Sequence, residues 1–139
     1  MKAEKWEIFL LIFSAIVFLD RILKNYLENS CLSIFCVKRA MNSGAAFGLF
    51  SGQTLLFIIV SVIVLIIIAY LWKTKGIRLP LTLLAAGTIG NLIDRLAYGK
   101  IIDLFSIAGS SSFNISDLSN LAGAVLIIIF ILGKKAKSK

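Results

Sequence analysis

The chain has 139 residues, of which 59% are apolar and 16% are charged, with a net charge of +8 and a mean hydropathy of +0.96. Soluble domains contain about 45–50% apolar residues, so this composition excludes a soluble enzyme, a disordered chain and a multi-domain protein. The absence of histidine and the presence of only two cysteines exclude a Ser–His triad, a Cys–His dyad, and zinc sites that use histidine or four thiolates. Any catalysis must therefore use carboxylate, Lys/Arg, hydroxyl or amide groups, and no cofactor or metal is expected.

Four segments are predicted to cross a membrane as helices, because one spanning helix needs about 20 apolar residues. The first apolar run, residues 8–19, is long enough only if its helix continues through Asp20 and Lys24. A cleaved signal peptide is the alternative, but the Asp20-Arg21 pair differs from the small-residue site that such a peptide needs. We therefore expect one membrane domain over residues 1–139, with spans at about residues 7–27, 54–72, 79–97 and 115–133.

Basic residues are distributed unevenly between the two sides of the predicted bundle. The termini and the loop at residues 73–78 hold nine Lys/Arg against two acids, whereas the other side holds six against five. Because Lys/Arg-rich loops stay in the cytoplasm, both termini are predicted to be cytoplasmic, with outer loops at residues 25–53 and 98–114. The net charge then reflects topology and attraction to anionic lipid. Nucleic-acid binding is not expected, because no basic stripe with interleaved aromatic residues is present.

The first outer loop predicts a short strand or hairpin around residues 32–37, followed by turns at residues 42–44 and 48–52. Cys31 and Cys36 lie five positions apart in an oxidising compartment, so a disulfide and a pair of free thiols are both open. No catalytic role is expected for either cysteine, because no base accompanies them.

Ionisable side chains at membrane depth are costly and are therefore candidates for function. Asp20 and Lys24 are four positions apart on one helical face and can pair, either as an interfacial ion pair or as support for an active site. Asn91 and Asp94 are one helical turn apart near the outer end of the third span and are expected to face together. Asp94 beside Arg95 is either a local structural charge cluster or part of a site.

Two carboxylates flank the second outer loop. Asp103 has apolar neighbours on both sides, so desolvation should raise its pKa, unless it is a solvated carboxylate at a strand end. Asp117 follows Asn114 and Ser116, residue types that cap helices, and a helix dipole favours an acid at this position. The intervening loop returns to the same boundary, so the two carboxyl groups are predicted to lie within about 6 Å and to share a proton. Such a pair can activate water, with Asp117 as the base and Asp103 as the proton carrier.

Four blocks of the sequence resemble, in this order, lipoprotein signal peptidase, the signal peptidase II family of bacterial membrane aspartic peptidases. The blocks are FLDRILKNYL (residues 18–27), NSGAAFGLF (42–50), GNLIDRLAYGKIIDLF (90–105) and FNISD (113–117). The resemblance implies a membrane α-helical fold of four transmembrane helices with a small extracytoplasmic β-sheet and a surface helix. The chain departs from the family pattern at Ser116, where alanine is common, and at residues 85–88, which are less rich in glycine. These differences bear on substrate preference.

The same resemblance implies roles for individual residues. Asp103 and Asp117 would be the catalytic pair, and Asn114 would position this pair or the scissile peptide. The supporting and substrate-binding candidates are Asp20, Lys24, Asn42, Gly44, Asn91, Asp94, Arg95 and Asn114.

The resemblance also implies the partners. The substrates would be diacylglyceryl-modified prolipoproteins, cleaved just before the lipidated cysteine, and globomycin-type inhibitors and membrane lipid would also bind. The protein is expected to be a monomer in the bacterial plasma membrane, with its active site at the outer face.

Two other classes of protein remain as alternatives. A small ion- or proton-coupled membrane transport subunit would use Asp20, Asp94 and Asp103 as a relay. A structural membrane partner would use its polar residues only to cap and pair helices. Since the acids gather at one boundary and no two halves look like inverted repeats, the sequence favours the peptidase.

Overall fold

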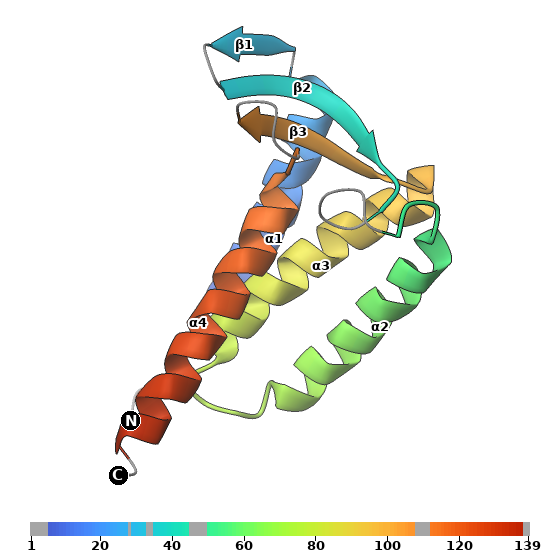
Figure 1. Cartoon of the computed structure of the whole chain (residues 1–139). Helices are drawn as coiled ribbons and strands as arrows, with labels where there is room; N and C mark the ends of the chain where they lie inside the picture. The colour runs from blue at the N-terminus through green and yellow to red at the C-terminus, as the bar shows by residue number, and fades with distance from the viewer. Residues whose placement is uncertain (1–5, 28, 33–34, 45–49, 108–111, 138–139) are drawn as a thin grey trace.

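The computed structural model of the chain is a helical bundle with a small β-sheet at one end (Figure 1). It describes residues 6–27, 29–32, 35–44, 50–107 and 112–137. The start of the first helix and the end of the last helix lie at the end of the bundle opposite the sheet (Figure 1). The elements in chain order are α1 (Trp6–Tyr26), β1 (Ser30–Leu32), β2 (Phe35–Asn42), α2 (Thr54–Leu71), α3 (Arg78–Tyr98), β3 (Ile101–Ile107) and α4 (Ile115–Lys137).

Helix α3 is the centre of the bundle. It packs against α1, α2 and α4, and α1 also contacts α4, whereas α2 packs mainly on α3. Figure 1 accordingly places α3 between α2 and the pair of α1 and α4. A small apolar core, formed by Ile68, Ile77 and Leu81, joins α2 and α3 at the end away from the sheet. The buried residues at the sheet end are largely polar, and that end therefore holds the candidate site.

Helices α2 and α4 are long and apolar enough to cross a membrane, by their length and composition. Few of their residues are buried, so their apolar side chains face outward, as expected for lipid-facing helices. Helices α1 and α3 have 21 residues each but carry charged side chains near their sheet ends. The four helices and the small sheet are therefore confirmed, and membrane crossing by α1 and α3 stays a prediction.

The three strands form one antiparallel sheet in the order β1-β2-β3. Ala40 of β2 pairs with Asp103 of β3, and Asn42 pairs with Ile101, beyond an irregularity between Val37 and Ala40. Strand β2 extends well past the predicted strand at residues 32–37, because β3 supplies the ladder partner for its second half. The expected surface helix is not among the described elements, and residues 45–49 of the first outer loop lie outside the described ranges.

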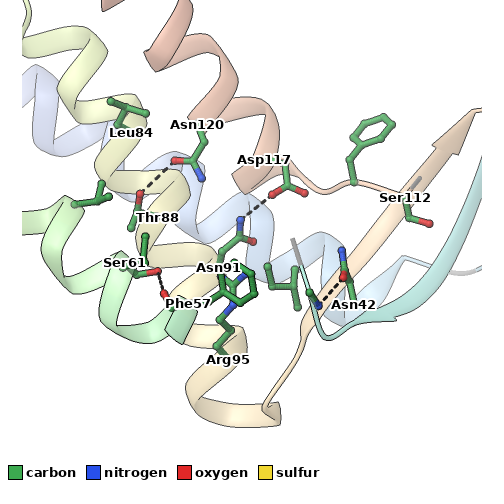
Figure 2. A pocket seen from close by; sticks show the side chains of 15 residues that line it. Asn42, Phe57, Ser61, Leu84, Thr88, Asn91, Arg95, Ser112, Asp117 and Asn120 are labelled. Carbon is green, nitrogen blue, oxygen red and sulfur yellow. Dashed lines mark hydrogen bonds between the residues drawn. The ribbon is translucent and has the colours of Figure 1, made fainter. Parts of the chain in front are cut away.

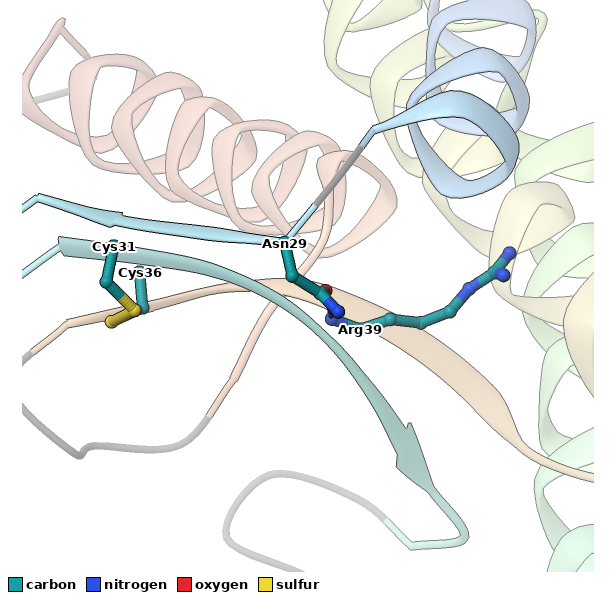
Figure 3. Close-up of a disulfide and its surroundings, with 4 residues drawn as sticks. All are labelled: Asn29, Cys31, Cys36 and Arg39. Carbon is teal, nitrogen blue, oxygen red and sulfur yellow. Dashed lines mark hydrogen bonds between the residues drawn. A yellow bond between two sulfur atoms is a disulfide. The ribbon is translucent and has the colours of Figure 1, made fainter.

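A disulfide joins Cys31 and Cys36, which are paired across β1 and β2 (Figure 3). Of the two states that the sequence left open, the structure therefore has the disulfide. Further along β2, the backbone N–H of Arg39 donates a 3.1 Å hydrogen bond to Oδ1 of Asn29. The guanidinium of Arg39 donates to the backbone carbonyl of Lys24. The cross-linked hairpin is thereby attached to the end of α1.

A tight turn at Gly99 ends α3 and reverses the chain into β3. Gly99 adopts a left-handed conformation with φ of 68°, and its N–H donates to the carbonyl of Arg95 at 3.0 Å. Glycine adopts this conformation at little cost because it has no Cβ. Strand β3 begins two residues later, so Asp103 lies close to the C-terminal end of α3.

Candidate active site

A buried ionic cluster connects α1 and α3 directly beneath the sheet. It contains two carboxylates, Asp20 and Asp94, and two cations, Arg21 and Lys24. Nζ of Lys24 lies 2.8 Å from Asp20 and 2.7 Å from Asp94, and Arg21 lies 2.5 Å and 2.6 Å from the same two acids. Asp20, Lys24 and Asp94 are almost completely buried. Because two positive charges balance two negative charges with hydrogen bonds, the burial is tolerable.

The two acids of the ionic cluster also hold the backbone on either side of the site. Oδ1 of Asp20 accepts the N–H of Ser116 at 3.1 Å, and Oδ2 of Asp94 accepts the N–H of Ile102 at 3.1 Å. Ser116 directly precedes Asp117, and Ile102 directly precedes Asp103. The cluster therefore fixes the chain immediately before each of the two predicted catalytic carboxylates.

Asn114 connects Asp103 to Asp117. Its side-chain amide donates to Oδ1 of Asp103 at 3.0 Å, and its backbone N–H donates to Oδ2 of Asp117 at 3.1 Å. Its side-chain oxygen accepts the N–H of Asp117 at 2.8 Å, so Asn114 also caps the first turn of α4. The side chain is fully buried. The sequence offered Asn114 as one of several possible caps, and the structure shows that it is the cap and that it contacts both carboxylates.

Two further amides complete the surroundings of the carboxylates. Nδ2 of Asn42 donates to Oδ2 of Asp103 at 3.2 Å, and Nδ2 of Asn91 donates to Oδ1 of Asp117 at 2.8 Å. The side-chain oxygen of Asn42 accepts the N–H of Gly44 at 3.0 Å, which holds the end of β2 in place. The carboxylates are thus oriented by amide donors from β2, α3 and the start of α4.

Asp103 is buried and its pKa is raised to about 6. Burial, which disfavours the charged form, is the main cause, and the negative charge of Asp117 adds to it. The amide hydrogen bonds from Asn42 and Asn114 oppose the shift. This confirms the expectation that desolvation raises the pKa of Asp103 and excludes the alternative of a solvated carboxylate.

A cavity of about 570 Å³ opens beside Asp117, between α2, α3 and α4 (Figure 2). Near the sheet its walls are polar, with Asn42, Asn91 and Arg95 beside Asp117. Farther from the sheet the apolar side chains of Val60, Val64 and Leu84 line the cavity, together with the polar side chains of Ser61, Thr88 and Asn120. The cavity can therefore hold a polar reacting group at one end and an apolar chain at the other.

Asp94 and Arg95, neighbours in the sequence, serve different parts of the site. Asp94 binds Arg21 and Lys24 of α1, whereas the guanidinium of Arg95 lies 4.7 Å from the ring centre of Phe57 and lines the cavity. Asp94 is therefore part of a charge cluster, but its ion pairs are with α1 and not with its neighbour Arg95. Asn91 and Asp94, one helical turn apart on α3, are both buried. Asn91 donates to Asp117, whereas Asp94 accepts from Lys24 and from the N–H of Ile102.

Sequence reasoning missed three polar residues of the site: Arg21, Thr88 and Asn120. Arg21 binds both acids of the ionic cluster, and its position beside Asp20 in a predicted span was a usable signal. Because Asp20 and Asp94 are both held by cations, the arrangement does not favour the proton relay of the transport alternative. Within the described ranges, no group of three or more His, Cys, Asp or Glu side chains could hold a metal ion.

Helices α3 and α4 approach closely at Gly90, and this contact leads to a prediction. A Cβ at Gly90 would lie 2.0 Å from Oγ of Ser116, which is buried and has no hydrogen-bond partner among the described residues. Removing an unsatisfied buried hydroxyl relieves a desolvation penalty, so Ser116→Ala is expected to stabilise the protein by about 1 kcal/mol. Gly90→Ala is expected to destabilise it, and less so in the Ser116→Ala background. Thermal unfolding of the purified proteins measures both effects, and equal losses in the two backgrounds would contradict this contact.

The comparisons with known proteins agree with this architecture. The family model described as Signal peptidase (SPase) II matches residues 12–133. Curated relatives named lipoprotein signal peptidase include one from Syntrophomonas wolfei subsp. wolfei, 34% identical over 91% of both chains. Another, from Lactococcus lactis subsp. lactis, is 34% identical over 84% of this chain and 87% of the relative.

Two solved structures of bacterial membrane enzymes have a fold similar to that of this chain. One described as a bacterial membrane enzyme, obtained by the in meso method at 2.3 Å resolution, has a TM-score of 0.88 and 27% identity over 96% of this chain and 92% of its own. A second, at 1.9 Å, has a TM-score of 0.81 and 28% identity over 91% and 93% of the two chains. The fold is thus that of bacterial membrane enzymes. The chain belongs to the signal peptidase II family, the lipoprotein signal peptidases, which are hydrolases acting on peptide bonds.

Proposed function

We propose that Asp103 and Asp117 are the catalytic pair with which this chain removes signal peptides from diacylglyceryl-modified prolipoproteins, just before the lipidated cysteine. The observation that carries the proposal is the shared contact with Asn114, which binds both carboxylates. Of the two carboxylates, Asp117 lines the polar end of the cavity. Family membership supports the reaction class, and the geometry supports the assignment of the two residues.

The two acids have different surroundings, and our assignment of base and acid rests on this difference. Asp117 lies at the start of α4, where the helix dipole and donors from Asn91 and Asn114 stabilise a carboxylate. Asp103 lies on β3, away from a helix start, and its pKa of about 6 lets it keep a proton to higher pH than a free carboxyl group does. We therefore assign Asp117 as the base and Asp103 as the acid, as in other pairs of carboxyl groups in unequal environments.

The reaction then follows from these two states. Asp117 takes a proton from water, whose oxygen attacks the scissile carbonyl carbon, while Asp103 gives its proton to the carbonyl oxygen. The carbon–nitrogen bond then breaks as the leaving nitrogen takes the proton from Asp117. A hydroxyl of the tetrahedral intermediate returns a proton to Asp103, so both acids regain their starting states.

The proposed membrane position places this chemistry at the outer boundary. The apolar faces of α2 and α4 support two spans, and the buried charges of α1 and α3 allow these helices to complete a bundle of four. The Lys/Arg-rich termini and the loop at residues 73–78 then lie in the cytoplasm, so the sheet and Asp103 lie outside. Water is available there, and the diacylglyceryl anchor of the substrate would set the depth of its scissile bond.

The cavity suggests how the protein would recognise its ligands. Its polar end suits the scissile amide, and its apolar walls on α2 suit the signal peptide and acyl chains that enter from the bilayer. Globomycin-type inhibitors would occupy the same cavity. The protein would act as a monomer surrounded by lipid, since one chain is sufficient to form the cavity.

Cleavage of a defined substrate tests the proposed function. The purified protein in lipid vesicles should shorten a diacylglyceryl-modified prolipoprotein at the bond before the lipidated cysteine, and globomycin should block this reaction. The same prolipoprotein without its diacylglyceryl group is the control and should remain intact. Cleavage of both forms at equal rates, or of neither form, would contradict the proposal.

The raised pKa of Asp103 predicts how the reaction depends on pH. Because Asp103 must carry a proton, kcat should fall as pH rises through about 6, the pKa of this group. The hydrogen bond from Asn42 favours the charged form, so Asn42→Leu should raise this pKa and move the fall in kcat to higher pH. Ser43→Ala, at the adjacent position, is the control. A fall that moves to lower pH in Asn42→Leu would contradict the assignment of Asp103 as the acid.

A further inference from the structure

Two polar residues lie in the apolar part of the cavity, one helical turn farther from the sheet than the amides around Asp117. Asn120 is three residues after Asp117 on α4, and Thr88 is three residues before Asn91 on α3. Both line the cavity, and Oγ1 of Thr88 donates a 3.3 Å hydrogen bond to Oδ1 of Asn120 (Figure 2). At 1.5 Å per residue, Asn120 lies about 4.5 Å farther along the helix axis than Asp117.

The contacts of Asn120 fix the orientation of its amide. Its oxygen faces Thr88, and Figure 2 shows its nitrogen on the side away from that hydroxyl. Gly87 packs against the same group, because a Cβ there would lie 2.6 Å from Oδ1 of Asn120. The hydrogen bond and the close glycine therefore hold the carboxamide with its N–H groups available to the cavity.

An available N–H donor in the wall of the cavity points to a ligand with a polar acceptor. Val60, Val64 and Leu84 line the same cavity and offer no side-chain acceptor, so a ligand that supplies one gains a hydrogen bond there. A signal peptide must lose its helical hydrogen bonds near the scissile bond to expose that bond to water. Its freed backbone carbonyls then need donors, because the bilayer supplies none.

We propose that Asn120, oriented by Thr88, binds the backbone of the signal peptide by donating a hydrogen bond to a carbonyl just upstream of the scissile bond. An extended chain rises about 3.3 Å per residue, so the 4.5 Å offset corresponds to the carbonyl one or two residues upstream. This inference rests on the proposed function, which places the scissile bond beside Asp117. It assigns Asn120 to substrate binding and Thr88 to the orientation of Asn120.

If Asn120 and Thr88 only stabilised the packing of α3 on α4, their substitution would affect stability and cleavage differently. Polar pairs between membrane helices also stabilise helix packing, and removing such a pair would lower stability without regard to the substrate. The two roles separate when the enzyme and the substrate are changed together, because only direct contact gives non-additive effects.

The test combines enzyme variants with substrates in which one upstream peptide bond is replaced by an ester. The ester carbonyl is a weaker acceptor, and each of the two candidate bonds is replaced in a separate lipidated substrate. For the wild type, kcat/KM should fall about five- to tenfold with the ester at one of these positions. Asn120→Leu should lower kcat/KM for the amide substrate by a similar factor, and the ester should then cause no further loss.

Two further variants complete the test. Ser61→Ala changes another polar residue of the cavity, whose hydroxyl already donates to the carbonyl of Phe57 at 2.8 Å, and it should keep the amide-to-ester ratio of the wild type. Thr88→Val keeps the carboxamide but removes its orienting donor, so it should show a reduced ratio even if Asn120→Leu does not fold. Additive losses at both ester positions, or a wild-type ratio in Thr88→Val, would overturn the inference. If the wild type cleaves none of the lipidated substrates, the proposed function itself fails.

Discussion

Asparagine at position 103 or 117 is expected to reduce cleavage of a lipidated prolipoprotein by about a thousandfold, the scale of a lost acid–base group. Asp103→Asn cannot deliver a proton in the assigned manner, and Asp117→Asn cannot take one from water. The substitutions preserve shape and leave a carbonyl oxygen for the donors on Asn42 and Asn91. Single-turnover cleavage in lipid vesicles measures the loss directly.

The matched control for these variants is Glu7→Gln, which neutralises an exposed carboxylate in the first turn of α1. It should cleave as the wild type does, because Glu7 lies far from the sheet end of the bundle. If Asp103→Asn or Asp117→Asn also cleaves near the wild-type rate while remaining folded, that residue is not part of a catalytic pair.

Breaking the ionic cluster is expected to have the second large effect. Asp94→Asn leaves Arg21 and the buried Lys24 with only Asp20 as a counter-charge, and an uncompensated buried charge costs about 3 kcal/mol or more. The variant should therefore unfold at a clearly lower temperature in detergent. It should also lose activity, because Asp94 holds the backbone N–H of Ile102 beside Asp103.

A charge-balanced double variant separates this cause from simple loss of packing. Arg21→Met together with Asp94→Asn leaves Lys24 paired with Asp20, so part of the lost stability should return. Glu7→Gln again serves as the exposed control. A double variant less stable than Asp94→Asn alone would show that charge imbalance is not the main cost.

The helices were predictable because their signals are local. Long apolar runs mark α2 and α4, and the four-residue spacing of Asp20 and Lys24 correctly predicted a pair on one face of α1. The length of β2 was not predictable, since its second half pairs with β3, which follows two intervening helices. Residue spacing within one segment carries no information on such pairing.

In the candidate site, too, features with a local sequence signal were predictable, and features that depend on contacts between distant segments were not. Asp103 and Asp117 stand out from their neighbours in the sequence, and the raised pKa of Asp103 followed from its apolar flanks. The partners of Asp94 could not be predicted, because Arg21 and Lys24 reach it only after α1 packs against α3. For the same reason, residue spacing does not show that Asn114 contacts both carboxylates, although the family resemblance implied that Asn114 positions this pair or the scissile peptide.

The bond between Cys31 and Cys36 has a consequence for biogenesis. Disulfides persist in oxidising surroundings and are rare in the reducing cytosol. If the proposed orientation is right, a molecule inserted in the opposite orientation would keep both thiols reduced. Alkylation of intact cells followed by mass measurement would then count correctly and wrongly inserted molecules. The redox state of the two cysteines in the hairpin therefore indicates on which side of the bilayer the hairpin folded.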